Sequence, residues 1–261
     1  MAYLRDTAIV LKNEPFREQD AWITLYGKEH GKLVAVARGA RSWKAKQLGQ
    51  LEPLSCVEVM IAKGQAFDKL AVAQMRGTRR GLRASLEGVA IAAAFADLVS
   101  QATQPNAPDE AIFTLSQHLF TCLSALPSGM SPERATLVYA GAVMQLLGLL
   151  GYGSQLDACV LCHTKLEDQA WAIGPAGGLV CGSCLRREPA WRERAVPLSK
   201  DMRKLLLFLV RVSGEEVLKL SAPPGYFRTV TQAVEELVQV LPLKTSPHGF
   251  HTISFLLQPL G

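Results

Sequence analysis

Four cysteines arranged as two Cys-x-x-Cys pairs constrain this chain more than any other feature of its 261 residues. The first pair is Cys159 and Cys162, the second is Cys181 and Cys184, and eighteen residues lie between the pairs. Each pair can turn both thiolates toward one point, and the intervening segment lets the pairs face each other around a tetrahedral cation. This spacing is typical of structural zinc sites, so we expect these cysteines to bind one Zn²⁺.

Two other uses of paired cysteines fit the sequence less well. Redox-active dithiols follow a strand–helix pattern that is absent around these cysteines. A disulfide framework is typical of short secreted chains, and the first residues lack the basic and apolar regions of a secretory signal. No apolar run approaches the roughly 18 residues needed to cross a bilayer. We therefore expect a cytoplasmic protein that does not enter membranes.

The net charge of +5 is unevenly distributed along the chain. Residues 1–80 contain 14 Lys and Arg against 8 Asp and Glu, whereas residues 81–261 contain 14 against 15. The basic character therefore belongs to the first third of the chain. Such asymmetry indicates an N-terminal module that binds a polyanion.

Five short segments in the first 80 residues have the apolar pattern and turn residues of β-strands. They are residues 7–11, 21–26, 32–37, 57–61 and 70–73. Five strands in a segment of this size predict a small closed barrel such as the OB-fold, although an SH3-like barrel would give a similar pattern. The stretch from Gly27 to Lys32 resembles a phosphate-binding loop but is one residue too short between its glycines. We interpret it as a hairpin turn.

From Ser85 onward the apolar period changes from two to about 3.6 residues, which predicts α-helices. The expected helices are 86–102 after the N-cap Ser85, 110–126, 132–150 after the N-cap Ser131, 200–212 after the N-cap Ser199, and one from Pro223 toward Val240. The predicted fold is thus α+β and multidomain. A five-stranded OB-fold barrel at residues 1–80 precedes an α-helical domain at 81–261, which carries the cysteine knuckle in an insertion at about 155–187. Residues 241–261 are expected to pack back onto the helices.

A basic segment follows the third predicted strand. It contains Arg38, Arg41, Lys44 and Lys46, with Trp43 among them and no acidic residue. Guanidinium and ammonium groups pair with phosphates, and a tryptophan can stack on a base. On a five-stranded barrel this segment would border the groove that OB-folds use for oligonucleotides. We therefore predict that these five residues bind nucleic acid, against the alternative of a solvated loop kept basic for solubility.

The sequence contains none of the common hydrolase motifs, and four thiolates would fill every position around a bound zinc ion. We therefore expect a structural metal and no enzymatic activity. Two rival hypotheses remain open. In one, the barrel and the zinc knuckle bind partner proteins rather than nucleic acid. In the other, the metal serves a hydrolase or nuclease, which requires an open coordination position.

The order and spacing of several motifs resemble the RecO family of bacterial recombination mediators over nearly the whole chain. These motifs are Asp20–Leu25, Glu29–Lys32, Ala37–Arg41, Leu146–Tyr152 and Leu156–Cys162. The resemblance implies an N-terminal OB-fold, a helical C-terminal domain and a four-cysteine zinc knuckle. Two features depart from the family: His163 stands where many relatives have glycine, and residues 253–257 match the family's ending poorly.

The resemblance also implies a function in DNA repair. RecO-like proteins bind single- and double-stranded DNA, anneal complementary strands, and act with RecR and often RecF. They help to load RecA onto strands coated with single-strand-binding protein, whose C-terminal tail they can grip, and such a protein would be associated with the nucleoid. Arg38 and Arg41 lie within a matched motif, whereas Trp43, Lys44 and Lys46 are predicted from their chemistry alone.

Overall fold

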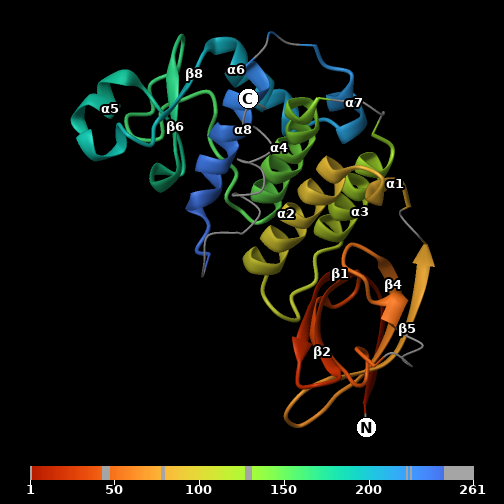
Figure 1. Cartoon of the computed structure of the whole chain (residues 1–261). Coiled ribbons are helices and arrows are strands. Elements are labelled where there is room, and N and C mark those ends of the chain that lie inside the picture. The colour runs from red at the N-terminus through yellow and green to blue at the C-terminus, as the bar shows by residue number, and fades with distance from the viewer. Residues whose placement is uncertain are drawn as a thin grey trace. The chain divides into compact units, whose positions relative to one another are not determined.

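The computed structural model describes residues 2–42, 48–77, 80–126, 131–221, 223 and 225–243. The chain forms two compact units, Met1–Ser124 and Ala125–Gly261, which are described separately below (Figure 1). The boundary predicted near residue 80 falls inside the first unit, between its strands and its helices, and stays a prediction. The part of residues 241–261 beyond Leu243, for which packing was predicted, lies outside the described residues.

The first unit begins with a closed five-stranded barrel. Its strands are β1 (Tyr3–Phe16), β2 (Asp20–Gly27), β3 (Gly31–Ala37), β4 (Cys56–Ala62) and β5 (Lys69–Gly77). They follow one another around the barrel in the order β1-β2-β3-β5-β4, with β4 pairing back onto β1 and β5 running parallel to β3. The predicted five-stranded, OB-like barrel is therefore confirmed, and all five predicted segments lie within these strands.

Apolar side chains that point inward from the strands fill the barrel. In β2, the apolar side chains of Ala21, Ile23 and Leu25 belong to the buried core, which β3 and β4 complete with residues such as Leu33 and Val59. Because successive side chains of a strand point to opposite faces, Trp22 lies on the outer surface of the barrel. The same alternation decides which side chains of these strands can meet a ligand.

The turn between β2 and β3 is held by a buried carboxylate of β1. Asp6 accepts hydrogen bonds from the backbone N–H groups of Glu29 at 3.1 Å and His30 at 3.0 Å. Gly31 adopts a φ of 66°, a left-handed conformation that favours glycine. The segment that resembles a phosphate-binding loop is therefore a hairpin turn, as predicted.

Three helices complete the first unit: α1 (Arg80–Arg83), α2 (Leu86–Ala102) and α3 (Glu110–Ser124). Ser85 caps α2, since its hydroxyl accepts a hydrogen bond from the backbone N–H of Gly88 at 3.0 Å. The predicted bounds and N-cap of this helix are confirmed. Helix α3 ends at Ser124, two residues earlier than predicted.

The second unit is built around α4 (Pro132–Leu149), with α6 (Lys200–Leu209), α7 (Gly214–Leu218) and α8 (Tyr226–Leu237) against it. The predicted N-caps Ser131 and Ser199 are confirmed. Helix α4 is buried over most of its circumference, which matches its uniformly apolar sequence. Helix α6 ends three residues before the predicted Val212, and α8 begins after Gly225, whose φ of 83° is not helical.

Between α4 and α6 the cysteine-containing insertion forms a small sheet and a short helix, seen beside α8 in Figure 1. Its elements are β6 (Ala170–Ile173), β7 (Gly178–Val180), α5 (Gly182–Arg187) and β8 (Val196–Leu198), with strand order β7-β6-β8. Strands β6 and β8 pack against α8. The sequence analysis does not predict these three strands.

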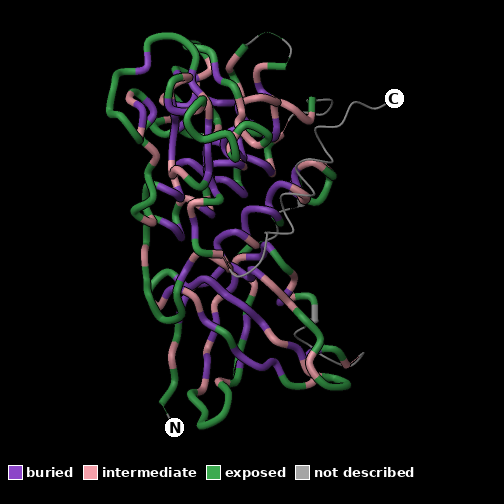
Figure 2. The backbone as a smooth tube through the Cα atoms, turned by 90° about the vertical axis from the view of Figure 1, so that its left-hand side faces the viewer, coloured by how far each residue is buried: buried purple, intermediate pink, exposed green. Residues whose placement is uncertain are grey.

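Buried residues line the strands and helices of both units, whereas exposed residues gather in the connecting turns, as the purple and green segments of Figure 2 show. Among the described residues, no helix combines the length and apolar character required to cross a lipid bilayer.

Candidate metal centre and nucleic-acid interface

The first cysteine pair lies in a tight turn between two short extended segments. Ala158 and Lys165 form an antiparallel bridge, and the backbone N–H of Cys159 donates to the carbonyl of Thr164 at 2.9 Å. The N–H of His163 donates a hydrogen bond to the carbonyl of Cys159, also at 2.9 Å. His163 has a φ of 58°, in the left-handed region. This conformation explains why glycine suits the position and why His163 fits it at some energetic cost.

The second pair joins the end of β7 to the start of α5. Cys181 is the N-cap residue of α5, and Cys184 lies within that helix. Gly182 sits against the indole of Trp171, because a Cβ at this position would lie 3.2 Å from the ring. The backbone N–H of Cys181 also points to the Sγ of Cys159, at 3.4 Å, so the two pairs are already linked.

The fold brings all four thiols together. The four Sγ atoms lie within 4.8 Å of one another, and Sγ of Cys162 is 3.8 Å from that of Cys181. Zinc–sulfur bonds of about 2.3 Å in a tetrahedron place the sulfurs roughly 3.8 Å apart. Cys159 and Cys184 are buried, whereas Cys162 is exposed. None of the six cysteines forms a disulfide. The cluster therefore fits one thiophilic metal ion, with all four positions taken by protein ligands.

Two of the thiols differ in acidity for clear physical reasons. Hydrogen bonds with Thr164 lower the pKa of Cys162 to about 6. Burial raises the pKa of Cys184 to about 12. A bound cation would supply the positive charge that the buried thiolate lacks, and its binding would release a proton.

A buried arginine that the sequence analysis missed supports the cysteine insertion. The guanidinium of Arg203, on α6, donates to the carbonyls of Leu166 at 2.8 Å, Glu167 at 3.0 Å and Asp168 at 2.8 Å. The segment that accepts these bonds follows the first cysteine turn and leads into β6. An arginine among lysines and leucines of an amphipathic helix carries no sequence signal for such a role.

Of the predicted nucleic-acid-binding residues, the structure describes two. Arg38 and Arg41 are exposed and follow the end of β3. Their loop is fixed to the start of β2, since the N–H of Arg41 donates to the carbonyl of Gln19 and the N–H of Gly39 donates to Asp20, at 2.9 and 2.8 Å. The other three predicted residues, Trp43, Lys44 and Lys46, lie outside the described residues.

Five other cations among the described residues of the first unit already form ion pairs. Lys12 pairs with Asp97 at 2.6 Å, Lys28 with Glu110 at 3.0 Å, Lys63 with Asp68 at 2.8 Å, Arg76 with Glu58, and Arg83 with Glu52. In the part of the chain that the structure describes, neither Arg38 nor Arg41 forms an ion pair. Their two charges are therefore directed to solvent or to a ligand.

Two family models match two successive segments of the chain. Residues 1–79 match "Recombination protein O N terminal" and residues 83–244 match "Recombination protein O C terminal". The chain belongs to the RecO family of DNA repair proteins. Arg38 and Arg41 lie in the region matched by the first model, and the four cysteines lie in the region matched by the second.

Individual RecO proteins resemble this chain over most of its length. DNA repair protein RecO of Caldanaerobacter subterraneus subsp. tengcongensis is 26% identical over 92% of this chain and 93% of its own. DNA repair protein RecO of Rubrobacter xylanophilus is 30% identical over 72% of this chain and 74% of its own. The RecO similarity thus spans both compact units.

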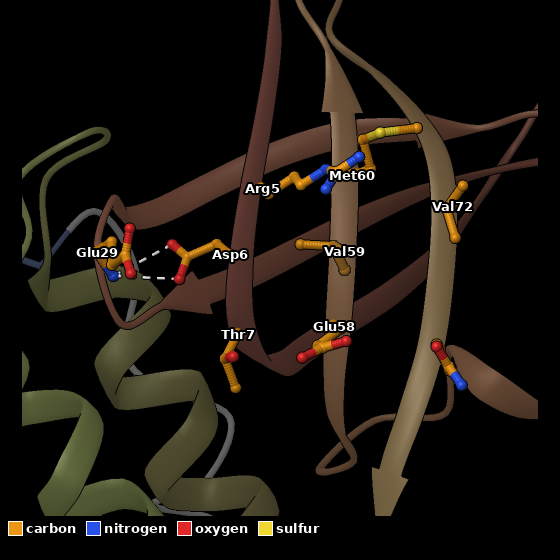
Figure 3. Close-up of a pocket in the computed structure, with 9 residues that line it drawn as sticks. Arg5, Asp6, Thr7, Glu29, Glu58, Val59, Met60 and Val72 are labelled. Carbon is orange, nitrogen blue, oxygen red and sulfur yellow. Dashed lines mark hydrogen bonds between the residues drawn. The ribbon is translucent and has the colours of Figure 1, made fainter.

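The barrel of this RecO family member also has a cavity of about 510 Å³ on the β1–β4–β5 side (Figure 3). Three carboxylates line it, from Asp6, Glu29 and Glu58, against one cation, Arg5, which extends toward Met60. Asp6 is occupied by the β2–β3 turn. Carboxylates in the lining disfavour the binding of phosphate groups in this cavity.

Proposed function

We propose that this RecO family member binds single- and double-stranded DNA through residues 1–80 and anneals complementary strands. The observation that supports this most directly is the pair of exposed guanidinium groups of Arg38 and Arg41 on an OB-like barrel, neither of which forms an ion pair with a residue that the structure describes. OB-folds bind oligonucleotides at the loops that border this part of the barrel. Trp43, Lys44 and Lys46 extend the proposed site by their chemistry and their position in the chain.

Annealing follows from charge neutralisation. Two DNA strands repel each other through their phosphates, and cations that contact both strands reduce this repulsion and release condensed counterions. The backbone is held while the bases stay accessible for pairing. This role requires no catalytic residue, and we propose that the protein is not an enzyme.

The metal proposed for the four cysteines is a single structural Zn²⁺. Its role is to hold the insertion between α4 and α6 in its folded form, since ligation energy in such sites is also folding energy. As a RecO protein, the chain is proposed to act with RecR, to contact the C-terminal tail of single-strand-binding protein, and to assist RecA loading, with RecF as a further partner.

The test is an annealing assay with complementary labelled oligonucleotides at low and moderate salt. The double variant Arg38→Gln/Arg41→Gln should lose most of the rate enhancement. The slope of log DNA affinity against log salt concentration should become shallower by about 1.4–1.8, the change expected for the loss of two phosphate contacts. The matched control is Lys28→Gln/Arg76→Gln, which removes the same charge from residues already paired with Glu110 and Glu58.

Three outcomes would reject this function. Unchanged DNA binding and annealing in the arginine variant, together with retained partner capture, would favour the protein-adaptor hypothesis. Equal losses in both double variants would show that net charge, rather than this site, determines binding. DNA cleavage by the metal-loaded protein would favour a metal-dependent nuclease.

A further inference from the structure

Three aromatic side chains meet at the end of the barrel that carries Arg38 and Arg41. Phe16 ends β1, Trp22 lies on β2, and Phe67 belongs to the turn that leads into β5. Their ring centroids are 4.8 Å apart for Phe16–Trp22, 5.1 Å for Trp22–Phe67 and 6.1 Å for Phe16–Phe67. Phe16 and Trp22 meet through the β1–β2 hairpin, and the β3–β5 pairing that closes the barrel brings Phe67 to them. We call this group the aromatic cluster.

The aromatic cluster is not part of the barrel core. The core consists of the inward-facing residues of the strands, and none of the three rings belongs to it. Phe67 is 45% exposed, and Phe16 and Trp22 are only partly buried. Exposure of a large apolar ring loses the favourable free energy of burial, so three such rings on one surface indicate a binding role more than a packing role.

Cations lie at the same end of the barrel as the aromatic cluster. The guanidinium of Arg17 lies over the ring of Phe16, 5.0 Å from its centroid. Lys69 is exposed and stands opposite Val36 of β3, which is in turn the cross-strand neighbour of Trp22. Arg41 is joined to this end of the barrel by the hydrogen bond from its N–H to Gln19 in the β1–β2 turn.

This combination has a specific chemical meaning. Guanidinium and ammonium groups attract phosphates of any nucleic acid, whereas an exposed ring offers a face on which a base can stack. Bases within a duplex are stacked on each other and do not offer their faces to a protein. Only an unpaired strand can therefore use the rings and the cations together.

We propose that Phe16, Trp22 and Phe67 form a stacking surface for the unpaired bases of a single strand, flanked by phosphate contacts from Arg17, Lys69 and the Arg38–Arg41 loop. This inference rests on the proposed DNA-binding function and makes it more specific. The cations bind single and double strands alike, and the aromatic cluster gives the protein its preference for single strands. During annealing, the bases leave the rings as they pair.

The test compares the binding of an oligothymidine and of a duplex of equal length by Phe67→Leu, Phe67→Tyr and the unchanged protein. Leucine keeps apolar contact with Phe16 and Trp22 but has no ring face, and Phe67 is exposed enough for the fold to tolerate the change. Single-strand affinity should fall between about fivefold and a hundredfold in Phe67→Leu, and duplex affinity should stay the same. Phe67→Tyr should restore single-strand binding.

The salt dependence provides a second measurement. Phe67→Leu should leave the slope of affinity against salt unchanged, because stacking releases no counterions, whereas Arg38→Gln/Arg41→Gln should reduce it. Tyr152→Leu serves as the control, since it removes an aromatic ring of similar exposure, 39%, from the other compact unit.

The outcomes separate this inference from the function on which it rests. If Phe67→Leu binds single strands normally while the arginine variant is impaired, the aromatic cluster does not stack bases and serves another apolar partner, and DNA binding stands. If single-strand and duplex affinity fall equally in Phe67→Leu, the selectivity is rejected. If the arginine variant also binds normally, the proposed DNA-binding function fails as well.

Discussion

The cysteine cluster and the aromatic cluster are assembled in opposite ways. The four cysteines lie between residues 159 and 184, in one turn and one helix start that are close in sequence. The aromatic cluster and its cations come from strand ends and turns spread between residues 16 and 69, which the strand pairing of the barrel brings together. A site made of rare residues with a fixed spacing can be recognised in a sequence. A site made of common residues gathered by topology cannot.

The two sites also differ in what stabilises them. Ligation of a metal ion would hold the cysteine cluster, and the hydrogen bonds from Arg203 support it from α6. The barrel instead fixes its surface through an apolar core and one buried carboxylate, Asp6, that binds the β2–β3 turn. Substitutions in the two regions should therefore affect different properties of the protein.

The largest effect is expected from Cys184→Ser. The hydroxyl is a poor zinc ligand, and the loss of one buried thiolate should abolish stoichiometric metal binding and destabilise the second unit by several kcal/mol. Zinc content by elemental analysis and thermal unfolding would measure both. Single-strand DNA binding should persist, because none of the four ligands lies in the barrel. Cys56→Ser is the control and should keep its metal; a full zinc complement in Cys184→Ser would contradict the metal assignment.

A smaller effect is expected from Arg203→Met, which tests the support of the cysteine insertion without touching a ligand. The three carbonyls of Leu166, Glu167 and Asp168 would lose a buried charged donor, which should cost about 3 kcal/mol of unfolding free energy. Chemical denaturation would measure this cost, and metal loss to a chelator should be faster. The exposed Arg192→Met should behave like the unchanged protein. Equal stability of the two variants would show that metal ligation alone holds the insertion.

The smallest effect is expected at the capping box of α7, remote in sequence from the cysteines. Ser213 and Glu216 bond to each other's backbone N–H groups, and Ser213→Ala should cost about 1 kcal/mol. Hydrogen bonds from Ser213 lower the pKa of Glu216, so this contribution is present above the carboxyl's unfolded pKa and is lost as pH falls through the folded pKa. Denaturation of the unchanged protein and of Ser213→Ala at neutral and acidic pH should show their stability difference shrinking in acid. A difference independent of pH would reject this role for Glu216.

Much of the fold follows from patterns that are local in sequence. The alternation of the five strands and the capping serines Ser85, Ser131 and Ser199 place most elements of the two units. Strands β6, β7 and β8 are only three or four residues long, too short for alternation to be visible. At the end of α6, Gln145 of α4 donates to the carbonyls of Leu209 and Val212, an interaction that the sequence does not reveal.

The same distinction between local sequence patterns and long-range contacts applies to the candidate sites. The four cysteines are clustered as their spacing predicts, whereas Arg203 and Asp6 carry no sequence signal because their partners are backbone atoms of distant turns. Phe16, Trp22 and Phe67 each look like ordinary strand or turn residues. Their meeting depends on the pairing of β1 with β2 and of β3 with β5, which alternation alone does not specify.

The pairing of β3 with β5 is much shorter than the pairing of β2 with β3. Strands β2 and β3 pair along their whole length, from Ala21–Ala37 to Gly27–Gly31. Strands β3 and β5 instead meet where Val36 faces Lys69, with the N–H of Val36 donating to the carbonyl of Asp68 at 2.9 Å. Phe67 lies on one side of this short β3–β5 pairing, and Trp22 lies on the other. A polynucleotide bound to both residues would hold the two strands together. Its binding would slow amide exchange at Val36 and raise the melting temperature of the barrel with the logarithm of ligand concentration.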